Sequence, residues 1–292
     1  VDGEKYTAEK FVIATGSTAN VPTIEGIHEV GYLTHIEALA LKDQLKEMVV
    51  IGAGPVGLEL AQIYSRFGTK VTILQRGERI FPHGESDLIA QLHKVLEGEG
   101  ITIHTKAEAK SVKMEDGKKL LSYTVDGQEQ TIAVDEILLA SGKTANTAEL
   151  NLEAAGVEVN DRKAVVVNEH FETNVPYVYA VGDVTSLPMR LETTAGHEGT
   201  LVAENIFTEK KNKIEYNEVP YAIFTDPGYA SVGLTEDAQM ERDGVCACRT
   251  VPFTSIPKAG IIGRTEGMIK MGIDPKTQVI VGCIFLPPMQ LI

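Results

Sequence analysis

The sequence predicts an α/β fold in which one domain is inserted into another, followed by the start of an α+β domain. Residues 48–76 have the pattern of a buried strand, a glycine-rich turn, an amphipathic helix and a second parallel strand. Two further segments, 11–16 and 178–183, each end an apolar strand with a glycine. From about residue 217 the pattern becomes rich in strands and turns. We therefore expect the two glycine-ended strands to belong to one domain that the central domain interrupts.

The central segment has the clearest element pattern. A strand at 48–51 precedes the turn, and a helix follows in which Val56, Leu60, Ile63 and Phe67 recur at three- and four-residue spacing. This spacing predicts that the four side chains share one buried face. A second helix is expected at 86–98 and a strand at 100–104. Two antiparallel segments should follow around the Asp-Gly turns at 116–117 and 126–127, and a final apolar strand at 136–140.

Composition restricts the classes of partner. The 292 residues are 43% hydrophobic and 23% charged, which allows a sizeable core in two or three domains. The formal net charge is −14 and no basic block offsets it, so nucleic acid and anionic membranes are not expected partners. No apolar run approaches the roughly 20 residues needed to cross a bilayer. Small molecules or metal ions are the expected substrates.

Neither end of the sequence has the features of a natural terminus. The chain begins with Val1 rather than Met, and its first apolar segment has the pattern of a strand from the middle of a domain. The last apolar strand, VIVGCIFL, stops where helices would be expected to follow. We therefore expect a chain cut at both ends. The three cysteines are too few and too clustered for a disulfide framework, which favours a reducing cytoplasm.

The turn GAGPVG fits the Gly-x-Gly-x-x-Gly pattern of dinucleotide-binding turns. The first glycine permits a tight turn, the second lets the backbone approach a pyrophosphate, and the third lets the helix pack on the strand. The helix start offers N–H groups and its dipole to the phosphates. A plain strand–turn–helix is the alternative, but the flanking strand and amphipathic helix favour dinucleotide binding. The predicted contact residues are Gly52, Gly54, Pro55, Val56 and Gly57.

The end of the second strand distinguishes the two nicotinamide nucleotides. An acidic residue there would bond the ribose 2′-hydroxyl, whereas an arginine would pair with a 2′-phosphate. The sequence has Gln75 and Arg76, followed by Arg79, so NADPH is predicted over NADH; in the alternative, the arginines are solvated loop charges. Glu59 lies one turn into the helix. Its carboxylate could reach the nicotinamide carboxamide, or it could be an ordinary solvent-facing glutamate.

Asp183 follows an apolar strand and precedes a predicted helix. An aspartate at this place can bond a ribityl hydroxyl while the helix points its N-terminus at a diphosphate. The alternative is a simple helix cap. Among the histidines none has ligand spacing, and His197 is the one singled out because it lies in the helix that follows.

Five segments together resemble the glutathione reductase–like flavoprotein disulfide reductases in order and spacing. They are FVIATGSTANVP (11–22), GAGPVGLELAQIYSRFGTKVTIL (52–74), LLASGKTANTAELNLEAAGV (138–157), VYAVGDVT (178–185) and TTAGHEGTLVAENI (193–206). The resemblance implies an FAD-binding Rossmann-like domain with an inserted NAD(P)-binding domain, then the interface domain of a homodimer. The implied ranges are 1–41 and 144–216 for FAD, 42–143 for NAD(P), and 217–292 for the incomplete interface domain.

The resemblance also implies cofactor contacts. Ala14, Thr15 and Gly16 would pass near the flavin, Gly182 and Asp183 would contact FAD, and Gly142 would lie at the NAD(P) site. Within the family, the segments at 144–157, 223–236 and 256–259 are most similar to mercuric reductases. The stretch GYLTHIEAL at 31–39 also matches those enzymes, which makes Tyr32 a candidate for the nicotinamide or metal pocket. Ordinary packing of Tyr32 is the alternative, and the one we favour.

By this resemblance the protein is an NADPH-dependent flavoprotein that passes electrons through FAD and a cysteine pair to Hg(II). Dihydrolipoamide dehydrogenases share most of the motifs, but normally carry an acidic residue at the Gln75 position. They, or another disulfide reductase, are one alternative. A non-catalytic nucleotide-binding fragment is the second, because the family's Cys-x4-Cys pair would precede Val1 and its C-terminal catalytic section would follow Ile292.

The cysteines present offer no confident catalytic or metal site. Cys246 and Cys248 lie on one face of a predicted strand, close enough for Hg(II), Cu(I) or Zn(II) to bridge. Incidental surface cysteines are the favoured alternative, and Cys283 is expected to be a small core residue.

Overall fold

A computed structural model describes residues 3–208 and 210–288. Contacts divide the chain into two units, each built from two stretches that are far apart in the sequence. The first unit is Val1–Ala19 with Lys143–Val219, and the second is Asn20–Gly142 with Pro220–Ile292. The four domain ranges expected from the sequence remain a prediction, because one unit of contacts can contain more than one ligand-binding domain.

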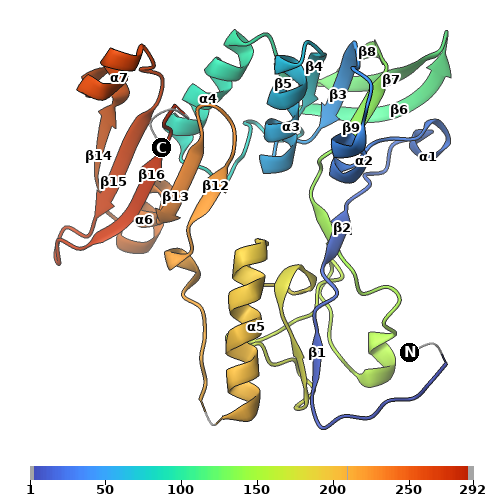
Figure 1. The fold of residues 1–292 in the computed structure, drawn as a ribbon, viewed down its shortest axis with the longest axis vertical. Helices are drawn as coiled ribbons and strands as arrows, with labels where there is room; N and C mark the ends of the chain where they lie inside the picture. Colours follow the sequence, from blue (N-terminus) through green and yellow to red (C-terminus); the bar gives the residue numbers. More distant parts are fainter. Residues whose placement is uncertain (1–2, 209, 289–292) are drawn as a thin grey trace. The chain divides into compact units, whose positions relative to one another are not determined.

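A parallel four-stranded sheet lies at the centre of the second unit (Figure 1). Its strand order is β5-β4-β3-β9, and every neighbouring pair is parallel. The connection β3–α3–β4 is the predicted βαβ unit. The elements are β3 (Glu47–Ile51), α3 (Pro55–Arg66), β4 (Lys70–Leu74), α4 (Ser86–Gly98), β5 (Thr102–His104) and β9 (Glu136–Leu139), preceded by α1 (Ile27–Val30) and α2 (His35–Ala40).

The buried face of α3 differs from the predicted one. Leu60 is buried, but Ile63 is 43% exposed and Phe67, just past the helix end, is 72% exposed. The face turned to the sheet instead includes Gly57 and Ala61, both buried. Leu58 and Tyr64 are buried as well, so the buried face is centred on positions 57, 58, 61 and 64, and Ile63 lies away from it.

An antiparallel three-stranded sheet follows the parallel one in the same unit. It has the order β6-β7-β8, with strands β6 (Ala107–Glu115), β7 (Lys118–Val125) and β8 (Gln128–Val134). The two Asp-Gly turns join them as predicted. Asp116 and Gly117 have φ of 49° and 76°, and Asp126 and Gly127 have 49° and 80°. Positive φ at both central residues suits a two-residue hairpin turn, since its twist matches that of the strands.

A five-stranded antiparallel sheet forms the C-terminal part of the second unit. Its order is β12-β13-β16-β15-β14. The elements are β12 (Tyr221–Ile223), β13 (Tyr229–Gly233), α6 (Glu236–Asp243), β14 (Ala247–Pro252), α7 (Pro257–Ile262), β15 (Met268–Ile273) and β16 (Ile280–Phe285). Tyr229 and Ile284 belong to the same apolar cluster as Leu88 of α4. The ring of Phe81 stacks on Tyr221 at 5.5 Å. The parallel sheet β5-β4-β3-β9 and the C-terminal sheet therefore share one hydrophobic core.

The first unit is built from short strands and one long helix. β1 (Phe11–Ile13) pairs in parallel with β11 (Val178–Ala180), so the two glycine-ended strands do belong together. β2 (Ser17–Ala19) pairs with β10 (Lys143–Ala145), and α5 (Glu192–Phe207) packs against the 3₁₀ turn Gly182–Val184. This pairing confirms the expectation that the two glycine-ended strands, which are separated by the central segment, belong to one domain.

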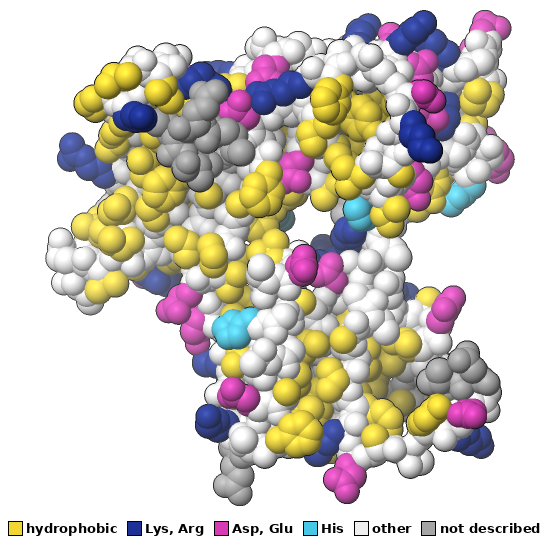
Figure 2. Space-filling view, in the orientation of Figure 1, with side chains coloured by type: hydrophobic (Ala, Val, Ile, Leu, Met, Phe, Trp, Pro, Cys, Tyr) yellow, Lys and Arg dark blue, Asp and Glu magenta, His cyan; other side chains and the backbone are white. Residues whose placement is uncertain are grey.

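One face of the C-terminal sheet presents apolar side chains to the surface (Figure 2). Tyr221, Val232 and Phe285 line a shallow hollow there, and Val232 and Phe285 are 37% and 36% exposed. Among the residues that the structure describes, no helix combines the length and the apolar character needed to span a bilayer.

Candidate functional site

The glycine turn after β3 has the geometry that its sequence pattern requires. Gly52 has φ of 107°, and a Cβ atom there would lie 2.4 Å from the carbonyl oxygen of Ala140. A Cβ atom on Gly57 would lie 2.1 Å from the carbonyl oxygen of Gly52, whereas one on Gly54 would meet nothing within 4 Å. The first and third glycines are therefore demanded by packing inside the protein. The second faces open space, where a ligand could approach the backbone.

The helix that follows this turn can serve as an anion site. Pro55 occupies its first turn, and the first bond within the helix runs from the Leu58 N–H to the Gly54 carbonyl at 3.0 Å. The N–H groups before Leu58, including that of Val56, lack acceptors within the helix and point outward with the positive end of its dipole. These residues fit a dinucleotide pyrophosphate, although their contact with a nucleotide remains a prediction.

Gln75 ties the end of β4 to the glycine turn. Its Oε1 accepts a hydrogen bond from the Ala53 N–H, and its Nε2 donates to the Arg79 carbonyl, both at 3.2 Å. Arg76 next to it is exposed. In an NADH site this position would carry an acidic residue that binds a ribose hydroxyl. Here it carries the neutral amide of Gln75, which is already bonded to the turn, and the cationic Arg76 lies next to it.

Glu59 is only partly exposed to solvent. Its carboxylate is half-buried, and Oε1 accepts a hydrogen bond from the Phe224 N–H at 2.9 Å. Burial raises the pKa of Glu59, an effect that the Phe224 bond partly offsets. Burial also raises the pKa of Tyr221 to about 12, with the Glu59 charge adding to it. The side chain is thus partly buried and bonded to the backbone at Phe224, and its role toward the nicotinamide remains a prediction.

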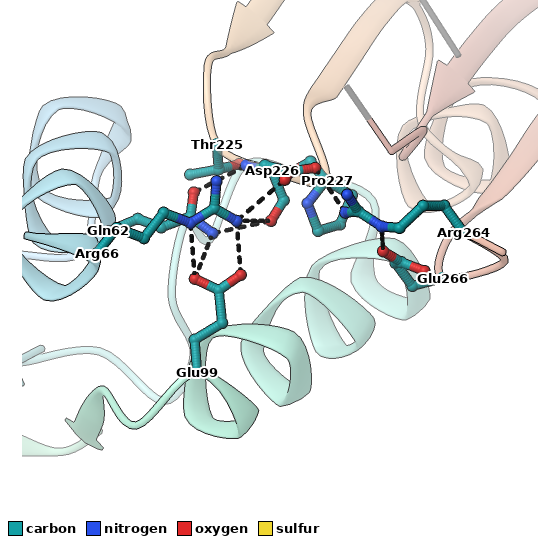
Figure 3. Close-up of polar contacts among 8 residues, drawn as sticks. All are labelled: Gln62, Arg66, Glu99, Thr225, Asp226, Pro227, Arg264 and Glu266. Carbon is teal, nitrogen blue, oxygen red and sulfur yellow. Dashed lines mark hydrogen bonds and ion pairs between the residues drawn. The ribbon is translucent and has the colours of Figure 1, made fainter. Parts of the chain in front are cut away.

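A polar network links Asp226, in the turn after β12, to helix α3 (Figure 3). Gln62 Nε2 donates to the Asp226 carbonyl and Gln62 Oε1 accepts from the Asp226 N–H, both at 2.8 Å. The Asp226 carboxylate pairs with Arg66 at 3.0 Å and with Arg264 at 2.9 Å, and Arg66 also pairs with Glu99 at 2.7 Å.

Sequence reasoning missed this network. Glu59, Gln62 and Arg66 are spaced so that they share a polar face of α3, which was a visible signal. Asp226, the partner of Gln62 and Arg66, lies 160 residues further along the chain from Arg66, and no local pattern indicates it.

The strands β1 and β11 bring the predicted flavin segments to one end of a parallel pair. Ile13 is in register with Ala180, so Ala14–Gly16 and Val181–Asp183 leave the pair at the same edge. Gly16 and Gly182 have φ of 71° and 74°, a conformation that other residues rarely adopt. Ala14 and Thr15 are exposed there.

Asp183 and Gly182 are fixed by side chains from elsewhere in the first unit. Asp183 Oδ2 accepts a hydrogen bond from the Ser17 hydroxyl at 2.7 Å, a contact that differs from the helix cap considered as its alternative role. The Gly182 N–H donates to Glu198 Oε2 at 2.6 Å. Tyr216 donates its hydroxyl to Glu198 Oε1 at 2.7 Å, and burial together with this bond raises the pKa of Tyr216. These residues fit an FAD site, with a half-buried carboxylate beside a glycine turn.

Glu198 is a residue that the sequence did not reveal. It is fully buried, whereas its neighbour His197, which the sequence singled out, is exposed. Its only local signal was a charged residue among small and apolar ones in AGHEGTLVA. A fully buried carboxylate that accepts two hydrogen bonds acts as a rigid support for the turn it holds.

Tyr32 and Gly142 lie in the second unit. Tyr32 packs against the cluster under the three-stranded sheet, and its ring meets His28 edge-on at 6.0 Å. This environment agrees with the packing alternative, and a role in a pocket remains a prediction. Gly142 has φ of 102°, and its carbonyl accepts a hydrogen bond from the Asn20 N–H at 3.0 Å. Its contact with a nucleotide remains a prediction as well.

The cysteines differ from the expectation. Cys246 and Cys248 form a disulfide, with Cα atoms 5.5 Å apart, because Cys246 precedes β14 and the chain there is less extended than a strand. In this form neither sulfur is a thiolate ligand. Cys283 is half-buried rather than a core residue, and burial raises the pKa of its thiol. Across residues 3–208 and 210–288, no three His, Cys, Asp or Glu side chains gather as a metal site.

Comparison with models of protein families identifies the family of this chain. Residues 1–199 match the pyridine nucleotide-disulphide oxidoreductase family, and residues 219–290 match the dimerisation domain of the same family. The chain therefore belongs to the pyridine nucleotide-disulphide oxidoreductases. This confirms the resemblance and the fold class inferred from the sequence.

Individual relatives fall into more than one enzyme type. A mercuric reductase of Staphylococcus aureus is 36% identical over 282 residues, covering 97% of this chain and 51% of the relative. A dihydrolipoyl dehydrogenase of Thermus scotoductus is 37% identical over 295 residues, covering 99% and 62%. Among solved structures, the HOCl-induced flavoprotein disulfide reductase RclA from Escherichia coli matches with a TM-score of 0.86 and 29% identity, covering 97% of this chain and 64% of that one. The chain thus spans about half to two thirds of these proteins.

Proposed function

We propose that the whole protein is a mercuric reductase-like enzyme, which takes electrons from NADPH and delivers them through FAD and a cysteine pair to Hg(II). The observation that carries the proposal is the end of β4, where Gln75 is bonded to the glycine turn and Arg76 is exposed. Similarity to mercuric reductases of Staphylococcus aureus and Bacillus cereus, at 36% and 34% identity, supports the choice of acceptor.

The residues of this chain would bind and orient the two cofactors. The turn Gly52–Gly57 and the first turn of α3 would hold the pyrophosphate of the nicotinamide nucleotide, and Arg76 and Arg79 would pair with its 2′-phosphate. Gly142, Glu59 and Tyr32 would line the same site. Nicotinamide and FAD, when bound, supply the hydride chemistry, and the protein contributes position and exclusion of water.

The flavin site would be held by the first unit. Ala14–Gly16 would pass beside the ring, and the Gly182 backbone and the Asp183 carboxylate would bond the ribityl chain. Ser17 and Glu198 would keep these two residues in place through the bonds described above. None of these side chains makes or breaks a bond to the electron acceptor, which we assign to a cysteine pair in the remainder of the whole protein.

Two further features complete the proposal. The apolar face around Val232 and Phe285, within the part that matches a dimerisation domain, would pack against a second copy and form a homodimer. The small number of cysteines favours the cytoplasm. The four domain ranges 1–41, 42–143, 144–216 and 217–292 are part of the same proposal.

The experiment is an acceptor comparison with the full-length protein loaded with FAD. NADPH oxidation is followed with Hg(II) in excess thiol, with lipoamide, and with neither acceptor. We expect oxidation that depends on Hg(II), and a kcat/KM for NADPH at least tenfold above that for NADH. Oxidation with lipoamide alone would overturn the choice of acceptor. Absence of bound FAD and of turnover with either acceptor would favour the nucleotide-binding fragment instead.

A second candidate is dihydrolipoamide oxidation. The Thermus scotoductus dihydrolipoyl dehydrogenase is as similar as the mercuric reductases, at 37% identity over 99% of this chain. It predicts NAD⁺-dependent oxidation of dihydrolipoamide. The neutral Gln75 at the end of β4 favours the mercuric alternative, because an acidic residue there would suit NAD⁺.

A further inference from the structure

Cys246 and Cys248 lie against a buried amide. Their Sγ atoms are 3.4 and 3.6 Å from Oε1 of Gln239 in α6. Gln239 is 1% exposed, and its Nε2 donates to the Ile273 carbonyl at 2.7 Å, so the orientation of the amide is fixed. The two cysteines are themselves half-buried and border solvent. Small molecules can therefore reach the sulfurs, but the amide oxygen behind them cannot turn to water.

Gly272 keeps the space for this arrangement. It is the strand partner of Cys248, and a Cβ atom there would lie 2.8 Å from Gln239 Oε1 and 3.6 Å from Cys248 Sγ. Any larger residue would push the amide away from the sulfurs. The contact thus depends on three elements, α6, β14 and β15.

The amide oxygen distinguishes the two redox states of the pair. Thiols carry hydrogens and can donate to the Gln239 Oε1 that lies beside them, whereas the bonded sulfurs of the disulfide in this structure carry none. The two sulfurs are the side-chain neighbours that reach this oxygen in the described structure. Oxidation therefore leaves a buried acceptor without its donors, which opposes the disulfide and makes it easier to reduce.

We propose that Cys246 and Cys248 form a reversible thiol–disulfide site in the C-terminal sheet, which exchanges with low-molecular-weight thiols and disulfides and is biased toward the dithiol by Gln239. Both sulfurs come from one short stretch of chain, so exchange needs no rearrangement of distant elements.

The exchange balances with a small disulfide as oxidant. One cysteine thiolate attacks a sulfur of the small disulfide, the small S–S bond breaks, and one small thiolate leaves. The second cysteine thiolate then attacks the protein sulfur of the mixed disulfide and releases the second small thiolate. Two electrons pass to the small disulfide, and the two protons lost by the cysteines are taken up by the two small thiolates, which become thiols. Reduction is the reverse.

A redox titration of the full-length protein tests the proposal. The protein is equilibrated without NADPH in buffers of increasing ratio of reduced to oxidised glutathione, quenched by alkylation and digested with trypsin. The peptide Asp243–Arg249 contains both cysteines and no other, so its mass reports the fraction oxidised. We expect one reversible transition between alkylated dithiol and disulfide. A peptide that stays in one state at every ratio, or even in excess dithiothreitol, would overturn the proposal.

Variants test the bias from the amide. Gln239→Met removes the acceptor, and we expect the equilibrium constant for disulfide formation to rise about tenfold, or about 30 mV toward more negative potential. Gly272→Ala displaces the amide and should shift the equilibrium in the same direction. Gln91→Met is the control, because its Oε1 is also buried but lies in α4. An unchanged midpoint in a folded Gln239→Met or Gly272→Ala variant would contradict the bias, as would an equal shift in the control.

Discussion

The two predicted cofactor turns are built in opposite ways. The turn Gly52–Gly57 lies within one continuous strand–turn–helix, and its glycines pack against its own backbone and Ala140, with one side-chain bond from Gln75 of the adjoining strand end. The turn at Gly182 and Asp183 is held by Ser17 and by Glu198, which come from separate segments. A turn fixed by its own glycines can be recognised from a motif. A turn fixed by distant polar side chains requires the fold.

The largest expected effect comes from the third glycine of the first turn. Gly57→Ala places a Cβ atom 2.1 Å from the Gly52 carbonyl oxygen, so strand and helix must separate. We expect a loss of about 2–3 kcal/mol of folding stability and of nucleotide binding. Urea unfolding and NADPH titration measure the two effects.

Gly54→Ala is the matched control, because its Cβ atom meets nothing within 4 Å in the protein. It should leave stability nearly unchanged while weakening nucleotide binding, since the new methyl occupies the space that the pyrophosphate would use. If both variants lost stability equally, the two glycines would not have the separate roles described.

The second prediction concerns the support under the flavin turn. Glu198→Leu replaces a fully buried acceptor and leaves the partly buried Gly182 N–H and Tyr216 hydroxyl without it, which costs about 2 kcal/mol and lowers the fraction of protein that retains FAD. Tyr216→Phe removes only one of these bonds and should retain more FAD. Flavin absorbance per protein after gel filtration gives the fraction. Full retention in Glu198→Leu would show that the turn does not need this support.

The comparison also explains what the sequence could predict. The glycine pattern, the strand ends at Gly16 and Gly182, and the helix Ser86–Gly98 follow from local composition and periodicity, and the structure has them where expected. Glu198 and Asp226 were missed because their meaning comes from partners far away in the sequence. Ile63 was misplaced because the buried face of α3 includes Gly57 and Ala61 together with Leu58 and Tyr64, and a pattern that counts only large apolar residues overlooks the two small ones.

The third prediction sharpens the choice of nucleotide at the first turn. Arg76→Ala removes an exposed cation from the end of β4, and we expect the preference for NADPH over NADH, as a ratio of kcat/KM, to fall about tenfold. Arg249→Ala, an exposed arginine on β14, is the control and should leave the ratio unchanged. An unchanged ratio in Arg76→Ala would mean that Arg76 is only a solvated loop charge.

The smallest expected effect concerns the hydrogen bond between Glu59 of α3 and the Phe224 N–H, which joins this helix to the C-terminal sheet. Burial raises the pKa of Glu59, so the folded protein holds a proton there at pH values where the unfolded chain has lost it. Stability from this group is present at low pH and falls as pH rises from the unfolded pKa through the folded one, because the folded state binds more protons in that window. Glu59→Gln keeps an oxygen to accept the Phe224 N–H bond but carries no charge. We expect it to gain about 0.5 kcal/mol near neutral pH and to lose this part of the pH dependence. Thermal unfolding of both proteins at several pH values measures the difference, and a variant less stable than the parent at neutral pH would show that the charge of Glu59 is stabilising.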